Sequence, residues 1–324
     1  MEYRRLGRTG AMVAPLALGT DNILNPTPED ESSRMIIRAL DAGINLIDTS
    51  NSYGAGEAER VIGRVLAESG RRDEAVIATK VHYPTGPGPN DRGNSRMHIM
   101  RACEQSLRRL QTDRIDLYQL HAWDPRTPID ESLGALDDLV RAGKILYAGC
   151  SNFLAYQVAR SLGRSETLGL ARFDSVQPRY NLLFRQIERE LLPLCTEDGI
   201  GVIPYNPMAG GFLSGKHRPG APTESTRFTL GTAADMYKER YWNERAFATV
   251  EAIRPLAAEA GMTMAQLAVA WVLAHPAVTA PIIGASRPEQ LADSVAALST
   301  PLDAGLKATL DDLTNEYRFG DAAR

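Results

Sequence analysis

The chain has 324 residues, of which 44% are hydrophobic and 23% are charged, a composition typical of a globular protein with a large core. Lys and Arg total 36 against 40 Asp and Glu, and the resulting net charge of -4 argues against nucleic-acid and anionic-membrane partners. The polar start MEYRRLGRTG lacks the apolar segment of a signal peptide, and no apolar run is long enough to cross a bilayer, so we predict a cytoplasmic protein.

The predicted elements begin with a short β-hairpin at residues 2–12, whose turn is indicated by Gly7 and Gly10. Eight short, mostly apolar segments follow, as expected for strands buried on both faces. They lie at 13–19, 45–50, 75–80, 115–120, 145–150, 173–178, 201–206 and 279–284. Amphipathic helices are predicted between them, most clearly at 30–42, 57–69, 96–110 and 130–142.

Strands that alternate with helices predict an α/β fold, and eight of them predict a (β/α)8 TIM barrel that forms a single domain over residues 1–324. Two long loops interrupt the alternation. Residues 84–95 are rich in Pro and Gly and follow the third barrel strand, and residues 207–242 follow the seventh. Because such loops lie at the carboxyl ends of the strands, where barrels build their active sites, we expect the functional site there.

Four polar residues lie at these carboxyl ends. Asp48 ends the second strand, Tyr53 follows in the next turn, Lys80 ends the third strand and His121 follows the fourth. Reduction of a carbonyl needs a proton for the developing oxyanion, and a phenol with a pKa of about 10 is a poor acid unless a cation lowers its pKa. A buried lysine in turn needs a carboxylate to stay charged. A Tyr, a Lys, an Asp and a neutral hydrogen-bonding group such as His would therefore suffice to reduce a carbonyl group. All four residue types are expected at the carboxyl end of the barrel.

These residues resemble those of the aldo-keto reductase superfamily. The segments GINLIDTSNSYGAGEAERVIG, IATK and DLYQLHAWD are similar to its catalytic motifs, and GCSNF, SVQPRYN, GVIPYNPMAGGFLSGK and PIIGASRPEQLADS to its cofactor segments. Together they span nearly the whole chain, in order, and are most similar to the bacterial, aryl-alcohol dehydrogenase-like and potassium-channel β-subunit-like branch. The resemblance implies an NADP-dependent alcohol dehydrogenase or carbonyl reductase. Tyr53 would be the general acid and base, Lys80 and Asp48 would tune it, and His121 would orient the carbonyl.

The resemblance also implies a cofactor site across the barrel mouth. Its nicotinamide end would comprise Gly19, Thr20, Asp21, Ser151, Asn152, Gln177 and the stacking ring of Tyr205. Its pyrophosphate would meet Asn206, Pro207, Met208, Ala209, Gly210, Lys216 and Arg227, and its adenosine end Gly284, Ser286, Arg287, Gln290 and Ser294. Because Arg287 and Ser286 suit a 2′-phosphate by charge and by a hydroxyl donor, we expect NADPH or NADP+ in preference to NADH.

Other functions are less well supported. A regulatory, cofactor-binding subunit resembling the potassium-channel β subunits is the main alternative. It is disfavoured because His121 is present where those subunits often carry another residue, and because no inactivating extension precedes the barrel. The five histidines show no HxxxH or HxH spacing, and the three cysteines form no CxxC pair, so we predict no metal site and reduced, buried thiols.

The substrate is expected to be a small carbonyl compound or alcohol, and the chain leaves its identity, the direction of reaction and a homo-oligomeric state open. An aromatic pocket wall would suit an aryl aldehyde or flat ketone. Its expected members are Ile23, Leu24, Tyr53, Tyr83, Trp123, Phe153 and Trp242. Alternatively, His82, Asp124 and Arg126 would bind the hydroxyl groups of a sugar.

Overall fold

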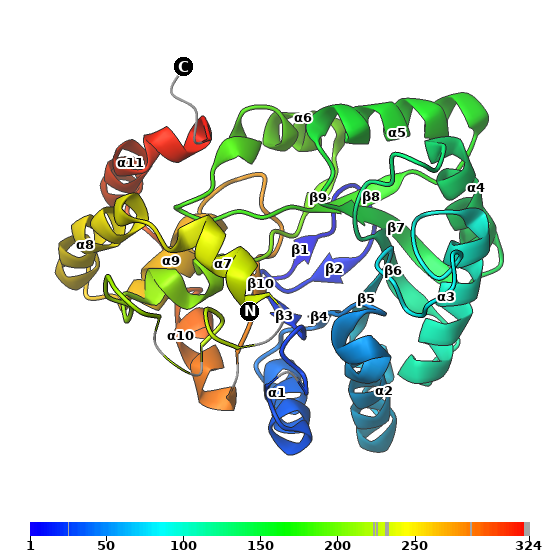
Figure 1. Cartoon of the computed structure of the whole chain (residues 1–324), viewed down its shortest axis with the longest axis horizontal. Coiled ribbons are helices and arrows are strands. Elements are labelled where there is room, and N and C mark those ends of the chain that lie inside the picture. Colours follow the sequence, from blue (N-terminus) through cyan, green and yellow to red (C-terminus); the bar gives the residue numbers. More distant parts are fainter. Residues whose placement is uncertain (25, 223, 225, 231–232, 286, 321–324) are drawn as a thin grey trace.

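The computed structural model describes the whole chain except residues 25, 223, 225, 231–232, 286 and 321–324. At its centre the described residues form a sheet of eight parallel strands in the order β10-β3-β4-β5-β6-β7-β8-β9 (Figure 1). The strands are β3 (Ala17–Gly19), β4 (Leu46–Asp48), β5 (Val76–Val81), β6 (Ile115–Leu120), β7 (Ile145–Ser151), β8 (Phe173–Gln177), β9 (Gly201–Val202) and β10 (Ile282–Ile283). Each overlaps one of the segments predicted from the sequence.

The two ends of this sheet meet and close it into a barrel. Val202 pairs with Val278, and Tyr205 pairs with Ile282, both in parallel bridges. The N–H of Ile282 donates to the carbonyl oxygen of Pro204 at 2.8 Å. The predicted (β/α)8 barrel is therefore confirmed.

Helices surround the barrel, as Figure 1 shows for α1 to α6. They are α1 (Glu29–Asp41), α2 (Glu57–Ser69), α3 (Arg96–Leu110), α4 (Ile129–Arg141), α5 (Ala155–Leu168), α6 (Leu191–Asp198), α8 (Glu244–Glu259), α9 (Met264–Leu273), α10 (Leu291–Ala296) and α11 (Ala304–Leu313). The predicted bounds of α2 and α3 match those observed, and α1 and α4 each begin and end one residue earlier than predicted. No single helix among the described residues is both long and apolar enough to span a membrane, although α8 and α9 pass that test together as a bent pair.

The predicted N-terminal hairpin is also present, with β1 (Arg4–Arg5) antiparallel to β2 (Met12–Val13). Its turn contains Gly7 at a φ of 57°, and a Cβ there would lie 2.6 Å from the backbone nitrogen of Gly201. Only glycine tolerates both conditions without strain. Leu6, beside this turn, is fully buried against the inner barrel residues, so the hairpin packs on the barrel interior.

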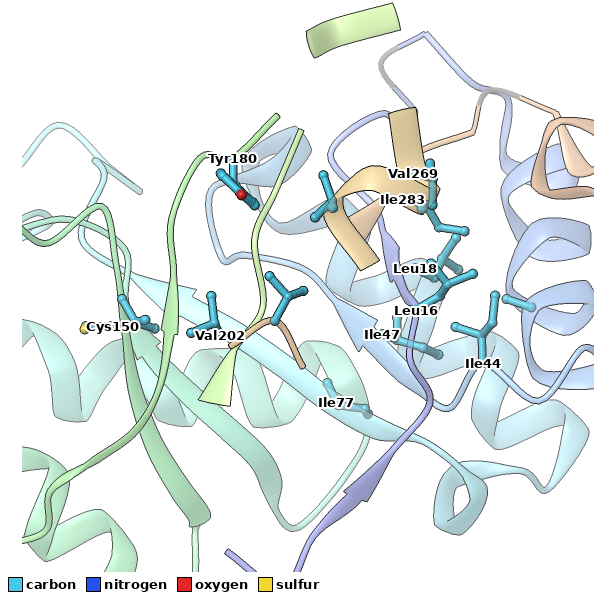
Figure 2. Packing of buried hydrophobic residues seen from close by; sticks show 14 of the residues in the cluster. Leu16, Leu18, Ile44, Ile47, Ile77, Cys150, Tyr180, Val202, Val269 and Ile283 are labelled. Carbon is cyan, nitrogen blue, oxygen red and sulfur yellow. The ribbon is translucent and has the colours of Figure 1, made fainter. Parts of the chain in front are cut away.

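Side chains alternate between two cores along each barrel strand, because successive residues of a strand point to opposite faces. Ile47 and Ile77 lie in the outer core between strands and helices, which Figure 2 shows from close by. Leu46 and Ala78 lie in the inner core. Continuing the alternation by two residues places Asp48 and Lys80 inside the barrel at its carboxyl end, and both are buried.

The two long loops differ in structure. Residues 84–95 contain no helix or strand, as predicted. The segment 207–242, predicted as a loop, contains the 3-10 helix η4 (Ala209–Ser214) and the helix α7 (Ala234–Tyr241). A cluster of aromatic rings including Phe212, Phe228 and Trp242 packs this insertion onto the main hydrophobic core, which explains why it folds more regularly than its polar sequence indicates.

Candidate active site

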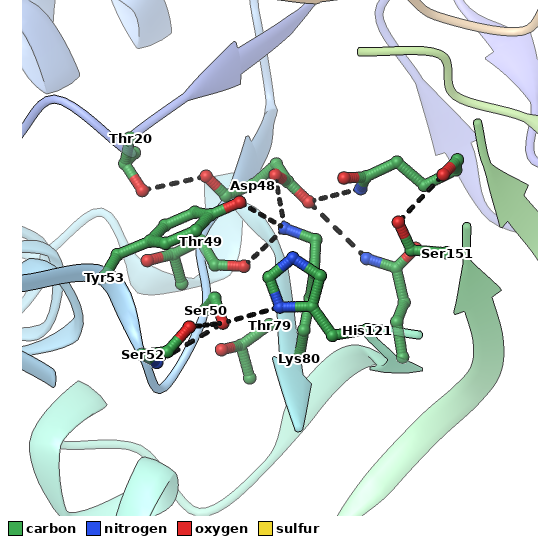
Figure 3. A network of polar contacts seen from close by, with 12 residues as sticks. Thr20, Asp48, Thr49, Ser50, Ser52, Tyr53, Thr79, Lys80, His121 and Ser151 are labelled. Atoms are coloured by element: carbon green, nitrogen blue, oxygen red, sulfur yellow. Dashed lines mark hydrogen bonds and ion pairs between the residues drawn. The ribbon is translucent and has the colours of Figure 1, made fainter. Parts of the chain in front are cut away.

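Four side chains named from the sequence come together at the carboxyl end of the barrel (Figure 3). Asp48 is the last residue of β4, Lys80 lies one residue from the end of β5, and His121 directly follows β6. Tyr53 begins the short 3-10 turn η1 (Tyr53–Gly56) that precedes α2. Because parallel strands end at one rim, residues far apart in sequence reach the same space.

Lys80 and Asp48 form a buried ion pair. Lys80 Nζ donates to Asp48 Oδ2 at 2.7 Å and to the carbonyl oxygen of Thr49 at 2.7 Å, and the two side chains are 0% and 4% exposed. Burial raises the pKa of Asp48, and the charge of Lys80 opposes this; burial likewise lowers the pKa of Lys80, and Asp48 opposes it. Each charge therefore depends on the other, and removal of one partner leaves an uncompensated buried charge.

Tyr53 meets the cation of this pair. Lys80 Nζ lies 3.4 Å from Tyr53 Oη, within hydrogen-bonding range. The expectation that the charge of the lysine lowers the pKa of the phenol stays a prediction. Burial raises the pKa of Tyr53 well above its usual range, and the charges of Asp48 and Asp21 raise it further. Tyr53 consequently stays protonated at neutral pH and is a proton donor in its resting state.

His121 is held as a neutral ring. Burial lowers its pKa well below the usual range, and the charges of Lys80 and His82 contribute in the same direction. Its Nδ1 lies 3.1 Å from Ser50 Oγ, and its ring meets the ring of Tyr53 edge-on with centroids 5.8 Å apart. When Ser50 donates to Nδ1, the single proton of the neutral ring sits on Nε2, where it can donate to a carbonyl oxygen.

Two side-chain amides also contact Asp48, and one of them, Gln119, was missed in the sequence. Gln177 Nε2 donates to Asp48 Oδ1 at 2.7 Å, and Gln119 Nε2 reaches the same oxygen at 3.4 Å. Gln177 was expected to contact a carboxamide instead, and that role stays a prediction. Gln119 could have been found, because strand alternation places it on the same inward face as Leu117.

Four of the residues predicted for the nicotinamide end form one hydrogen-bonded chain beside His121. Ser151 Oγ donates to the carbonyl oxygen of Gln177 at 2.8 Å. Asn152, at a φ of 57°, donates from Nδ2 to Ser151 Oγ at 3.1 Å and to the carbonyl oxygen of His121 at 2.9 Å. Tyr205 Oη donates to Asn152 Oδ1 at 2.9 Å. The structure thus places this set against the four candidate catalytic residues.

At the other side of the mouth, Asp21 and Arg227 are joined by an ion pair. Thr20 Oγ1 donates to the carbonyl oxygen of Asp48 at 2.9 Å, so Gly19, Thr20 and Asp21 follow β3 directly into the site. The ion pair connects them to the insertion that follows β9. Asp21 and Arg227 had been expected to contact different parts of a cofactor, and those roles stay predictions.

The remaining predicted cofactor residues lie along the same insertion and beyond β10. Asn206, at a φ of 67°, accepts from the N–H of Gly210 at 2.6 Å, which shapes the run Pro207, Met208 and Ala209 that leads into η4. Lys216, Gly284 and Arg287 are exposed, whereas Ser294 is buried. The backbone N–H of Arg287 donates to Gln290 Oε1 at 3.3 Å. Ser286 lies outside the described residues.

The predicted pocket wall is only partly in place. Tyr83 is 42% exposed and its ring centroid lies 4.7 Å from that of His121, so it borders the site. Trp242 instead donates from Nε1 to the carbonyl oxygen of Gly220 at 2.8 Å and packs in the aromatic cluster of the insertion. Phe153 is 3% exposed and packs on Trp123.

Asp124, a member of the alternative sugar-binding set, is hydrogen-bonded within the chain. This carboxylate is buried and accepts from the backbone N–H of Asn94 at 3.0 Å, from that of Arg126 at 3.0 Å and from the hydroxyl of Thr127 at 2.9 Å. His82 Nδ1 lies 2.9 Å from Asn94 Oδ1. These bonds hold the end of the loop 82–95 in place, and binding of a sugar by Asp124 stays a prediction. Among the described residues, no group of three or more His, Cys, Asp or Glu is arranged to hold a metal ion.

Comparison with known proteins gives consistent matches over the full barrel. A sequence model of the aldo/keto reductase family matches residues 15–315. The chain is 41% identical over 323 residues to the uncharacterized oxidoreductase YrpG of Bacillus subtilis, covering 97% of this chain and 96% of that protein. It is 35% identical over 301 residues to a probable voltage-gated potassium channel subunit beta of Arabidopsis thaliana, covering 92% and 91%. It is also 35% identical over 307 residues to the L-glyceraldehyde 3-phosphate reductase of Escherichia coli, covering 92% and 88%.

Proposed function

Because the chain belongs to the aldo/keto reductase family of oxidoreductases, we propose that it interconverts an aldehyde or ketone and the corresponding alcohol, with NADPH or NADP+ as its cofactor. The observation that carries the proposal is the position of Tyr53 Oη, 3.4 Å from Lys80 Nζ, beside a neutral His121. A proton donor, a fixed positive charge and a neutral hydrogen-bond donor then face the same small volume.

Tyr53 donates the proton in the direction of reduction. Its raised pKa keeps the phenol protonated at neutral pH, and the transfer is favourable because an alkoxide is a stronger base than a phenolate. The phenolate that remains lies next to the ammonium of Lys80, whose charge Asp48 maintains. In the oxidation direction Tyr53 must first lose its proton, so we expect oxidation to need a higher pH than reduction.

His121 orients the carbonyl oxygen. Being neutral, it donates one hydrogen bond from Nε2 without competing with Tyr53 as an acid. The ring of Tyr83 covers one side of His121 and limits the access of water to it. The two donors, from Tyr53 and His121, would bind the same oxygen as negative charge develops on it.

The residues at the mouth fit a nicotinamide dinucleotide, which supplies the hydride when bound. Tyr205 offers a half-buried aromatic ring next to the amide of Asn152, and this pair suits the flat ring and its carboxamide. Lys216 and Arg287 are exposed cations, as binding of a pyrophosphate and a 2′-phosphate requires. The exposed guanidinium of Arg287 is our reason for preferring NADPH to NADH.

Aromatic carbonyl compounds are the proposed substrate class. Tyr83 is partly exposed beside His121, so a flat ring bound at the carbonyl site would pack against it. Asp124 already accepts hydrogen bonds from its own loop, which weakens support for the sugar alternative. The proposal is tested by incubating the protein with aryl aldehydes, aliphatic aldehydes and sugars while following NADPH absorbance. We expect turnover to be highest with the aryl aldehydes.

A regulatory role is the second candidate, favoured by the similarity to a protein named as a potassium channel subunit beta. Because proteins with the same fold can have different functions, the fold does not distinguish an enzyme from a regulatory subunit. A measurement of turnover does. A protein that binds NADPH in a fluorescence titration but reduces no compound in the panel would support the regulatory role. Turnover that requires Tyr53 would support the enzyme.

A further inference from the structure

A second buried ion pair lies immediately behind the candidate active site. Glu59 of α2 is fully buried, and its Oε2 accepts from Arg109 Nε of α3 at 2.7 Å. Its Oε1 accepts from the hydroxyl of Thr79 of β5 at 2.6 Å. A carboxylate without access to water is costly unless its oxygens are satisfied, and here both are. One residue thus ties together two helices and a barrel strand.

Arg109 packs against the turn that carries Tyr53. A Cβ on Gly56 would lie 2.9 Å from Cδ and Nε of Arg109, so the arginine side chain lies flat on the backbone at this glycine. Gly56 has a φ of 95° and ends the 3-10 turn that Tyr53 begins. The position of this turn, and with it that of the phenol, therefore depends on where Glu59 holds Arg109.

Thr79 connects the carboxylate of Glu59 to β5, the strand that carries Lys80. Thr79 precedes Lys80 on β5, and the alternation of the strand turns Thr79 toward the helices and Lys80 toward the barrel interior. The charge of Glu59 also raises the pKa of Lys80, against the effect of burial. Glu59 thus acts on the lysine by position and by charge.

We propose that Glu59 is a positioning residue that, through Arg109 and Thr79, fixes the turn of Tyr53 relative to the strand of Lys80 and so sets the separation of phenol and ammonium. The inference rests on the proposed function in that the separation matters for proton donation. Turnover would then depend on Glu59, although Glu59 would touch neither substrate nor cofactor. Small displacements of reacting groups reduce rates steeply, so a change in this network should reduce kcat more than it affects binding.

The first test separates position from charge. Thr79→Val removes the hydroxyl that Glu59 holds and keeps the shape of the side chain, whereas Thr79→Ser keeps the hydroxyl. We expect kcat for aldehyde reduction to fall about tenfold in Thr79→Val, with KM for NADPH unchanged, and to be largely restored in Thr79→Ser. Arg60→Gln is the control, because it removes an exposed ion pair of the same helix. Equal kcat in the valine and serine variants would overturn the proposal.

The second test does not depend on turnover. The ammonium of Lys80 can be followed by NMR of isotope-labelled lysine side chains as pH is raised, in the full chain and in Glu59→Gln. We expect Lys80 to lose its proton at lower pH in Glu59→Gln, because a charge that favours the ammonium is gone. An unchanged titration in a folded variant would refute the electrostatic part of the proposal. If the unaltered chain reduces no carbonyl compound, the proposed function fails, whereas this titration still decides the role of Glu59.

Glu59→Gln leaves Arg109 without its carboxylate, so its fold is checked by circular dichroism before it is titrated. Should it fail to fold, Glu59→Gln combined with Arg109→Met removes both charges, and kcat for aldehyde reduction is measured in this double variant instead. We expect kcat to fall about tenfold, because the turn of Tyr53 loses its contact with Arg109. A kcat equal to that of the unaltered chain would contradict the proposal.

Discussion

Replacement of Lys80 by methionine removes the cation from the candidate site and keeps a side chain of similar length. Lys80 Nζ lies 3.4 Å from Tyr53 Oη, and at that distance a unit charge stabilises a phenolate by about 5 kcal/mol for an effective dielectric of about 20. If about half of a unit negative charge has developed on the phenol oxygen in the transition state, Lys80 stabilises that state by about 2.5 kcal/mol. Loss of this stabilisation corresponds to a fall in kcat of about a hundredfold. If the proton were fully transferred in the transition state, kcat would fall by about three to four orders of magnitude.

The same substitution also reduces stability, because Asp48 then lies buried and, among the described residues, keeps only the amides of Gln119 and Gln177 as side-chain partners. Loss of one member of a buried ion pair typically costs about 3–5 kcal/mol in the free energy of unfolding. The double variant Lys80→Met/Asp48→Asn removes both charges. We expect it to recover much of the stability and none of the activity.

Steady-state reduction of an aryl aldehyde with NADPH gives kcat for the unaltered chain and both variants, and urea unfolding gives their stabilities. Loss of activity in both variants, with stability recovered in the double variant alone, would assign the catalytic effect to the ammonium. A Lys80→Met variant whose kcat stays within a factor of about three of the unaltered chain would refute the reasoning, because this difference is less than 1 kcal/mol.

Three further predictions concern the cofactor, the substrate and pH. Arg287→Ala should weaken NADPH binding about tenfold or more and leave NADH binding unchanged in fluorescence titrations, because a charge-assisted hydrogen bond is lost; equal losses for both cofactors would contradict the assignment. Tyr83→Ala should lower kcat/KM for aryl aldehydes more than for short aliphatic ones; a uniform loss would exclude a role in selection. Burial lowers the pKa of His217 to about 4. The unfolded chain therefore binds a proton below about pH 6.5 that the folded chain resists, and the free energy of unfolding should fall from there toward pH 4. His217→Phe should make this decline shallower in urea unfolding at several pH values, and an unaltered decline would be inconsistent with the cause given.

The barrel could be predicted because its strands are buried on both faces. Each strand therefore appears in the sequence as a short apolar segment. The first four helices were placed to within a residue because apolar side chains such as Ile36 and Ile62 recur at helical spacing. The family resemblance is confirmed over residues 15–315. Helix α7 could not be predicted, because its place depends on aromatic contacts such as that between Phe228 and Tyr237, which only the folded insertion creates.

At the site, residue types at strand ends were enough to bring Asp48, Tyr53, Lys80 and His121 to one place. The raised pKa of Tyr53 was not foreseen, since desolvation depends on burial that a sequence does not display. The same holds for Asp124, whose three hydrogen bonds identify it as a loop anchor only once Asn94 and Thr127 are seen beside it. Partners that are distant or depend on loop conformation are the ones that sequence patterns did not reveal.

The central claim, that Tyr53 is the proton donor, is tested most directly by comparing NADPH binding and single-turnover aldehyde reduction in Tyr53→Phe. The variant keeps the ring beside His121 and loses only the hydroxyl. We expect NADPH affinity close to that of the unaltered chain and a rate of reduction lower by about two orders of magnitude or more. Reduction at the unaltered rate, in a variant that binds NADPH normally, would contradict this claim.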